Sequence, residues 1–221
     1  MGLYLVEVYR SPNIGIFLRA NDKFLLAPKG IASTKSKLLA DNLRVTPVFV
    51  SVEGTRLLGP LIAMNNKGMV VSRMIEDYEV KEIASQTGLR VEKFNSKFTA
   101  VGNLVAANDN GAVVSPILDQ AAVSQIEDVL DVEILRLAIP EYVQVGALIV
   151  ATNSGAAVYP KLTEKDVEDV AGVFKVDAYP ASVNGGIPFL TSGLIANSSN
   201  AVVGKLTTGP ELIFLTKALN V

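Results

Sequence analysis

A short phrase that recurs along this chain constrains its fold more than any other feature. In the clearest copy, apolar runs at residues 104–107 and 112–114 flank the turn Asn108-Asp109-Asn110-Gly111. Asn-Gly turns join antiparallel strands tightly because these residues tolerate positive φ angles. We therefore expect a β-hairpin here, with positive φ angles in its turn.

Further copies of the phrase lie at residues 63–71, 151–158 and 196–203, and a degraded copy lies at residues 20–26. Counted along the chain, each of the first four copies has a glycine six residues before the first residue of its turn. These register glycines are about 44 residues apart: Gly15, Gly59, Gly102 and Gly146. In the fifth copy Thr191 falls at that position and Gly193 is shifted by two. Such a period is the signature of a repeat architecture.

Each unit is predicted to contain two strands, a helix and a third strand. In the third unit Asp119 can cap a helix, and residues 132–137 alternate as a half-buried strand does. Between them, apolar residues recur at helical spacings of three and four: Ala122, Val123, Ile126, Val129 and Leu130. In the second and fourth units, Gly88 and Gly172 are expected to end the corresponding helices.

The two ends of the chain complement one another. The fifth unit stops at Val221 before its third strand, and the chain begins with an unassigned strand at residues 3–9. Residues 6–10 resemble residues 132–136, the third strand of unit three. We infer that the first strand completes the last unit and closes a ring, because closure removes exposed sheet edges. One domain is expected, of repeats at about 11–54, 55–98, 99–141, 142–183 and 184–221 completed by 1–10.

Composition excludes several classes of protein. With 49% apolar residues the chain can bury a core, yet no apolar run approaches the ~20 residues of a membrane helix. Neither cysteine nor histidine occurs, which excludes nucleophiles activated by histidine. A carboxylate pair stays possible, but turn and surface roles explain Asp109, Glu127 and Asp128. We expect a cytoplasmic protein that is not an enzyme and has no cofactor, metal, membrane partner or small-molecule substrate.

The residues also carry a family resemblance. The recurrent glycine and hairpin units, Gly102-Asn103-Leu104 before the Asn-Asp turn, and residues 207–212 resemble archaeal translation initiation factor six over nearly the whole chain. The resemblance implies an α/β pentein fold, in which five ββαβ-like subdomains surround a pseudo-fivefold axis. It further implies a monomer that binds the intersubunit face of the large ribosomal subunit, sterically blocks the small subunit, and acts in initiation and large-subunit biogenesis.

The resemblance also implies where binding occurs. Segments after the register glycines would form a rim that docks a large-subunit ribosomal protein beside the sarcin–ricin loop. The rim residues are Ile14, Gly15, Ile16, Gly59, Pro60, Gly102, Asn103, Ala147, Leu148, Pro188 and Phe189. An uncharged rim suits a protein partner better than phosphates, and the net charge of −2 agrees with this. If RNA is touched, the basic edge of unit one is expected to face it: Arg19, Lys23, Lys29, Lys35 and Lys37.

Two other readings stay open at this level. One is a general five-unit interaction scaffold such as a small propeller, since the repeat length also suits propeller blades. The helix in each unit speaks against it, because propeller blades contain only strands. The other is a carboxylate-based enzyme on a pentein frame, which a small molecule bound in the central channel would support.

Overall fold

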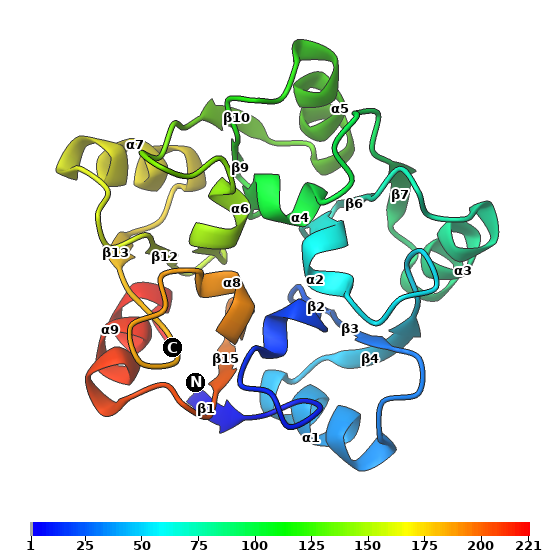
Figure 1. The fold of residues 1–221 in the computed structure, drawn as a ribbon, viewed down its shortest axis with the longest axis horizontal. Coiled ribbons are helices and arrows are strands. Elements are labelled where there is room, and N and C mark those ends of the chain that lie inside the picture. The colour runs from blue at the N-terminus through cyan, green and yellow to red at the C-terminus, as the bar shows by residue number, and fades with distance from the viewer. Residues whose placement is uncertain (1) are drawn as a thin grey trace.

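Secondary structure repeats five times in the computed structural model, which describes residues 2–221. The described chain forms five three-stranded sheets and nine α-helices, and one further 3₁₀ helix stands where a tenth would be. The five units surround a common centre, with short helices near the middle and long helices at the periphery (Figure 1). The predicted mixed α/β class and five-unit repeat agree with this architecture.

The elements follow the same order in each unit. The sheets are β2 (Arg19–Ala20), β3 (Phe24–Pro28) and β4 (Thr46–Val50); β5 (Ile62–Met64), β6 (Gly68–Val71) and β7 (Arg90–Lys93); β8 (Val105–Ala107), β9 (Gly111–Val114) and β10 (Glu133–Arg136); β11 (Val150–Ala151), β12 (Ala156–Val158) and β13 (Ala178–Pro180); and β14 (Leu194–Ala196), β15 (Asn200–Gly204) and β1 (Gly2–Val6). The middle strand of each sheet runs antiparallel to its inner neighbour and parallel to its outer one.

Two kinds of helix alternate along the chain. The long helices are α1 (Ser33–Leu43), α3 (Asp77–Thr87), α5 (Gln120–Leu130), α7 (Glu164–Phe174) and α9 (Gly209–Leu219). The short helices are η1 (Ile14–Ile16), α2 (Leu58–Leu61), α4 (Val101–Leu104), α6 (Val145–Leu148) and α8 (Leu190–Gly193). The short helices contact one another in that succession, and α8 contacts η1. Among residues 2–221, no helix combines the length and apolar character needed to cross a membrane.

The N-terminal strand belongs to the last sheet. β1 pairs in parallel with β15, with Gly2 opposite Asn200 and Val6 opposite Gly204. The third strand of the fifth sheet therefore comes from the beginning of the chain, and the two termini lie close together in Figure 1.

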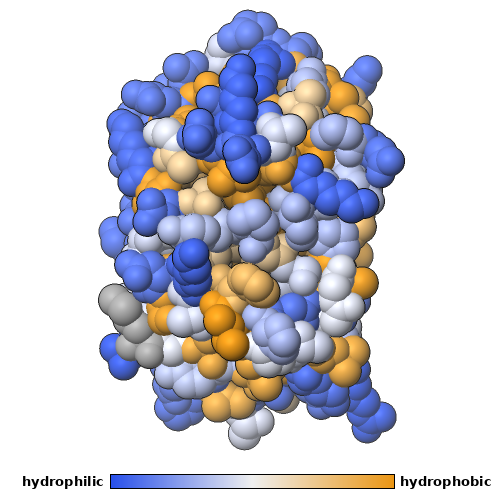
Figure 2. Space-filling view, turned by 90° about the vertical axis from the view of Figure 1, so that its left-hand side faces the viewer, coloured by the Kyte–Doolittle hydropathy of each residue, from blue (hydrophilic) through white to orange (hydrophobic). Residues whose placement is uncertain are grey.

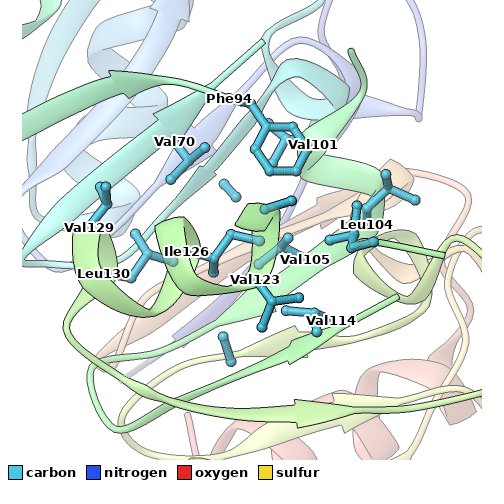
Figure 3. Packing of buried hydrophobic residues seen from close by; sticks show 14 of the residues in the cluster. Val70, Phe94, Val101, Leu104, Val105, Val114, Val123, Ile126, Val129 and Leu130 are labelled. Atoms are coloured by element: carbon cyan, nitrogen blue, oxygen red, sulfur yellow. The ribbon is translucent and has the colours of Figure 1, made fainter. Parts of the chain in front are cut away.

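The core forms between each long helix and the sheets it covers. In the third unit Val123, Ile126 and Leu130 of α5 point into one cluster together with Val105 (Figure 3). Val70, from the sheet of the second unit, lies in the same cluster. Each such side chain contributes roughly 1.5–3 kcal/mol by burial. Neighbouring units therefore stabilise one another through shared cores.

The turn glycines have a different role from the predicted one. Gly111 does not adopt a positive φ angle, so that prediction is wrong. A Cβ atom on Gly111 would lie 2.2 Å from the carbonyl oxygen of Val173 in the following unit. The turn is shaped instead by Asn108, whose Oδ1 accepts the backbone N–H of Asn110 (2.9 Å) and of Gly111 (3.0 Å). Glycine is required by close packing.

One of the two predicted helix stops is correct. Gly88 ends α3 in the left-handed conformation, at φ 69°. Gly172 does not end α7, which continues to Phe174 and terminates at Lys175 with φ 56°. A glycine inside a helix costs only about 1 kcal/mol relative to alanine, a cost that the packing of Phe174 in the core can offset.

Candidate binding surface at the short-helix end

The register glycines pack against one another at the end of the molecule formed by the short helices. A Cβ atom on Gly59 would lie 1.8 Å from the carbonyl oxygen of Gly15, and one on Gly15 would lie 1.9 Å from that of Thr191. Gly102 and Gly146 repeat the pattern against the preceding unit, at 2.2 and 2.6 Å. Side chains are excluded because the backbones touch. These glycines hold the short helices in a rigid frame.

A concave surface lies on this frame. Its volume is about 270 Å³, and we call it the rim pocket. It is lined by Gly15, Ile16, Gly59, Pro60, Asn103, Gln144, Ala147, Phe189, Thr191 and Ser192. Its walls are mainly apolar, with a few amides and hydroxyls and no charged residue in the lining. Pockets of this character bind apolar groups and orient them by a few hydrogen bonds.

Edge-to-face contacts between aromatic rings fix one wall of the rim pocket. The ring of Tyr142 lies edge-on to that of Phe189 with their centroids 5.4 Å apart, and edge-on to that of Tyr159 at 5.6 Å. Edge-to-face pairs of this kind contribute about 0.5–1.5 kcal/mol beyond area burial. Phe189 is therefore held in place before any partner arrives.

The structure gathers most of the predicted rim residues at this pocket. The residues predicted from the sequence that line it are Gly15, Ile16, Gly59, Pro60, Asn103, Ala147 and Phe189. Ile14 and Leu148 are fully buried in the core, so the prediction that they contribute to the surface is wrong. Gly102 is buried behind the pocket and Pro188 lies half-buried before α8. In both places the chain is close to the rim without lining it.

Sequence reasoning missed three lining residues, Gln144, Thr191 and Ser192. Thr191 takes the register position of the fifth unit, and its hydroxyl donates to the carbonyl of Ala147 at 3.3 Å. The repeat register alone could have placed Thr191 at the rim. Nothing in the local pattern distinguishes Gln144 or Ser192, whose positions depend on how neighbouring units pack.

Arg19 does not face outward, which contradicts its predicted place on an RNA-facing edge. Its Nε donates to the carbonyls of Gly59 (3.0 Å) and Ile62 (3.1 Å), and its Nη2 donates to that of Gly102 (3.0 Å). Burial lowers the pKa of Arg19 to about 10. The side chain connects three units and uses its donors within the protein, not on an outward-facing edge.

The four predicted lysines differ in their surroundings. Lys29 forms an ion pair with Glu82 at 2.8 Å, and the hydrogen bond from that pair raises the pKa of Lys29. Lys37 pairs with Asp41 at 2.9 Å. Lys23 is exposed at a hairpin turn, and Lys35 is half-buried on α1. Two of the four positive charges are thus partly neutralised by neighbours.

The hairpin turns at the opposite end are joined by a cycle of hydrogen bonds, which we call the turn ring. The backbone N–H of Asp22 donates to Asn66 Oδ1 at 3.0 Å, that of Asn66 to Asp109 Oδ1 at 2.9 Å, and that of Asp109 to Asn153 Oδ1 at 3.0 Å. Asn153 then donates to Ser198 Oγ at 3.2 Å, and Ser198 to Asp22 Oδ1 at 2.7 Å. Asp109 thus has a structural role.

The ionised groups of the turn ring have structural roles and do not form a catalytic arrangement. Burial disfavours ionisation of Asp22, but hydrogen bonds from Ser198, Asn66 and Asn153 outweigh it and lower its pKa. Within residues 2–221, no group of three acidic side chains is placed to hold a metal ion. On the side of the molecule in Figure 2, hydrophilic and hydrophobic residues are interspersed. The rim pocket is distinguished by its mainly apolar, uncharged lining.

The fold and this surface define an α/β repeat protein of five units with a concave, uncharged rim. The eIF-6 family model matches residues 3–218. Proteins named translation initiation factor 6 from Cenarchaeum symbiosum and from Nitrosopumilus maritimus are each 45% identical over 218 residues, covering 99% of this chain and of each relative. That from Thermococcus gammatolerans is 40% identical over 224 residues, covering 99% of this chain and 98% of the relative. The chain belongs to the eIF-6 family.

Proposed function

We propose that the rim pocket binds the joining face of the large ribosomal subunit and so keeps the small subunit from associating with it. Membership of the eIF-6 family supports a role in translation initiation. The observation that carries the surface assignment is the rim pocket itself, which is concave, uncharged and mainly apolar. The function needs no chemistry, because a compact body on the joining face excludes the second subunit by its volume.

In this proposal, the partner at the rim pocket is a ribosomal protein next to the sarcin–ricin loop. The centres of protein interfaces are apolar and contain few charged groups. Ile16, Pro60 and Phe189 give the rim pocket this character. A phosphate backbone would call for arginine and lysine instead. Adjacent rRNA would be reached by the basic edge of unit one, where Lys35 and Lys23 remain as candidates, and binding would then weaken as salt rises.

We further infer that the protein acts in the cytoplasm as a monomeric, single-domain pentein ring closed by β1, with a second role in large-subunit biogenesis. Support for closure comes from three contacts between the ends of the chain. β1 pairs with β15, α8 contacts η1, and Ser198 donates to Asp22 across the turn ring. Support for a role without catalysis comes from the structural bonds of Asp22 and Asp109.

The surface assignment is tested by placing a bulky charge at the rim pocket and at the opposite end. Asn103→Arg puts a cation beside the apolar walls, and Ser199→Arg puts the same side chain on an exposed hairpin turn. We expect Asn103→Arg to weaken co-sedimentation with purified archaeal large subunits at least tenfold, and Ser199→Arg to bind as the parent does. Equal binding of both variants would reject the rim pocket as the contact surface.

A further inference from the structure

Arg19 lines a partly open cavity between the two ends of the molecule. This axial cavity has a volume of about 60 Å³. Its walls are the inner strands of the five sheets, together with Arg19, Gly146 and Thr191. Because one water molecule needs roughly 10–15 Å³ on this scale, the cavity has room for on the order of four water-sized groups.

The guanidinium of Arg19 has hydrogen-bonding capacity that the surrounding protein does not use. A guanidinium carries five N–H donors. Nε–H is shared between the carbonyls of Gly59 and Ile62, and one N–H of Nη2 reaches Gly102. Among residues 2–221, no acceptor is found for the other N–H of Nη2 or for the two of Nη1. Arg19 nevertheless retains accessible surface, and it lines the cavity. The free N–H groups of Nη1 and Nη2 can therefore donate to a group bound in the cavity.

The lining of the axial cavity contains one charged side chain. No carboxylate belongs to the described residues that line it, so Arg19 is its single formal charge. Asp22 and Asp109 lie beyond it, in the turn ring. Their Oδ2 atoms accept from the side-chain amides of Asn66 and Asn153 at 2.6–3.1 Å. A buried charge without a partner of opposite sign is costly.

We propose that the axial cavity binds one small monovalent anion of the halide class against the guanidinium of Arg19. The cavity supplies what such an ion requires: an unneutralised cation, several free N–H donors and room for a few water-sized groups. The same guanidinium holds the carbonyls of Gly59 and Gly102, directly behind the rim pocket. Binding of the anion therefore stabilises the rim frame from inside without entering the partner surface.

The test measures unfolding by urea in sodium chloride and in sodium glutamate at equal ionic strength. Above the dissociation constant, each tenfold rise in chloride is expected to raise the folding equilibrium constant tenfold, about 1.4 kcal/mol, since one ion binds the folded state. Bromide should act like chloride. Arg19→Met removes the cation and keeps a long side chain of similar shape. The stability of this variant should therefore be the same in chloride as in glutamate. Equal stability of the parent protein in both salts would overturn the proposal.

A second measurement does not depend on whether Arg19→Met folds. Crystals of the parent protein grown in sodium bromide are expected to show one anomalous peak in the axial cavity, next to Nη1 of Arg19. Water alone in the cavity would overturn the proposal. A bromide peak without salt-specific stabilisation would mean an adventitious ion only, and would overturn it as well.

Discussion

The side-chain amide of Asn108 donates to the carbonyl oxygen of Phe174 at 2.8 Å, where α7 of the following unit ends. It also donates to the carbonyl of Thr152 at 3.0 Å. The Oδ1 atom of the same side chain shapes its own hairpin turn. One buried asparagine therefore both forms a turn and fastens it to the next unit. Asn65 repeats this arrangement with Leu130, at 2.8 Å.

We predict that Asn108→Ala lowers the free energy of unfolding by about 3 kcal/mol. The change removes four hydrogen bonds, of which only the one to Phe174 leaves its acceptor with a second donor, the amide of Asn110 at 3.1 Å. Each buried backbone group that loses its partner and is not rescued by water costs roughly 1–3 kcal/mol. Urea unfolding followed by circular dichroism measures the effect. Asn95→Ala, at an exposed position, is the matched control and should change stability by less than about 0.5 kcal/mol. Equal effects of the two substitutions would contradict this account of the turns.

The fourth unit offers the reverse experiment. Thr152 stands where the other units have asparagine, and its hydroxyl bonds with Ser154 and Gly155 of its own turn. Thr152→Asn adds an amide that can reach the carbonyl of Leu219 at the end of α9, as Asn108 reaches Phe174. We expect a gain of about 1 kcal/mol, visible as a higher melting temperature. A loss of stability would mean that the fifth unit is packed too differently to accept the bond.

Alanine substitutions at two glycines should have opposite effects. In Gly59→Ala the new methyl group would lie 1.8 Å from a backbone oxygen, so the short helices must move apart. We expect a loss of about 3 kcal/mol or more. Gly172 lies within α7 with open space around it, and Gly172→Ala should add about 1 kcal/mol through helix propensity. Thermal unfolding of both variants measures the contrast. Similar melting temperatures would argue against a rigid glycine frame.

Glu211 should make stability sensitive to acid. Burial disfavours its ionisation, but hydrogen bonds from Thr208, Gly186 and Ser182 prevail and lower its pKa to about 2. Because the folded pKa lies below the unfolded one, its contribution is complete above pH ~4.5 and is lost as pH falls toward 2. That contribution is at most about 3 kcal/mol, and solvent screening reduces it to about 1–2.

Glu211→Gln tests this contribution. The variant should be less stable than the parent at pH 7, and the difference should shrink as pH is lowered toward 2. Unfolding in urea across this pH range gives both curves. A difference that stays constant with pH would show that the carboxylate charge is not the cause.

The sequence patterns predicted the elements whose signal is local or periodic. The hairpins, the long helices such as α5 and the pairing of β1 with the fifth unit follow from repeats and from apolar spacing. The short helices were missed because one turn is too brief to show a period. The orientation of Arg19 was mispredicted because its partners, Gly59 and Gly102, lie 40 and 83 residues away. The need for glycine at position 111 likewise could not be explained from the local sequence, because the atom that excludes a side chain there is the carbonyl oxygen of Val173 in the following unit.

We propose that this protein prevents ribosomal subunits from joining. The most direct measurement mixes purified archaeal large and small subunits with increasing amounts of the protein and follows the joined ribosome in sucrose gradients. We expect the joined peak to disappear at about one protein per large subunit and the protein to move with the large subunit. Asn103→Arg should leave the joined peak intact. A joined peak that persists while the large subunit is saturated with protein would contradict the claim.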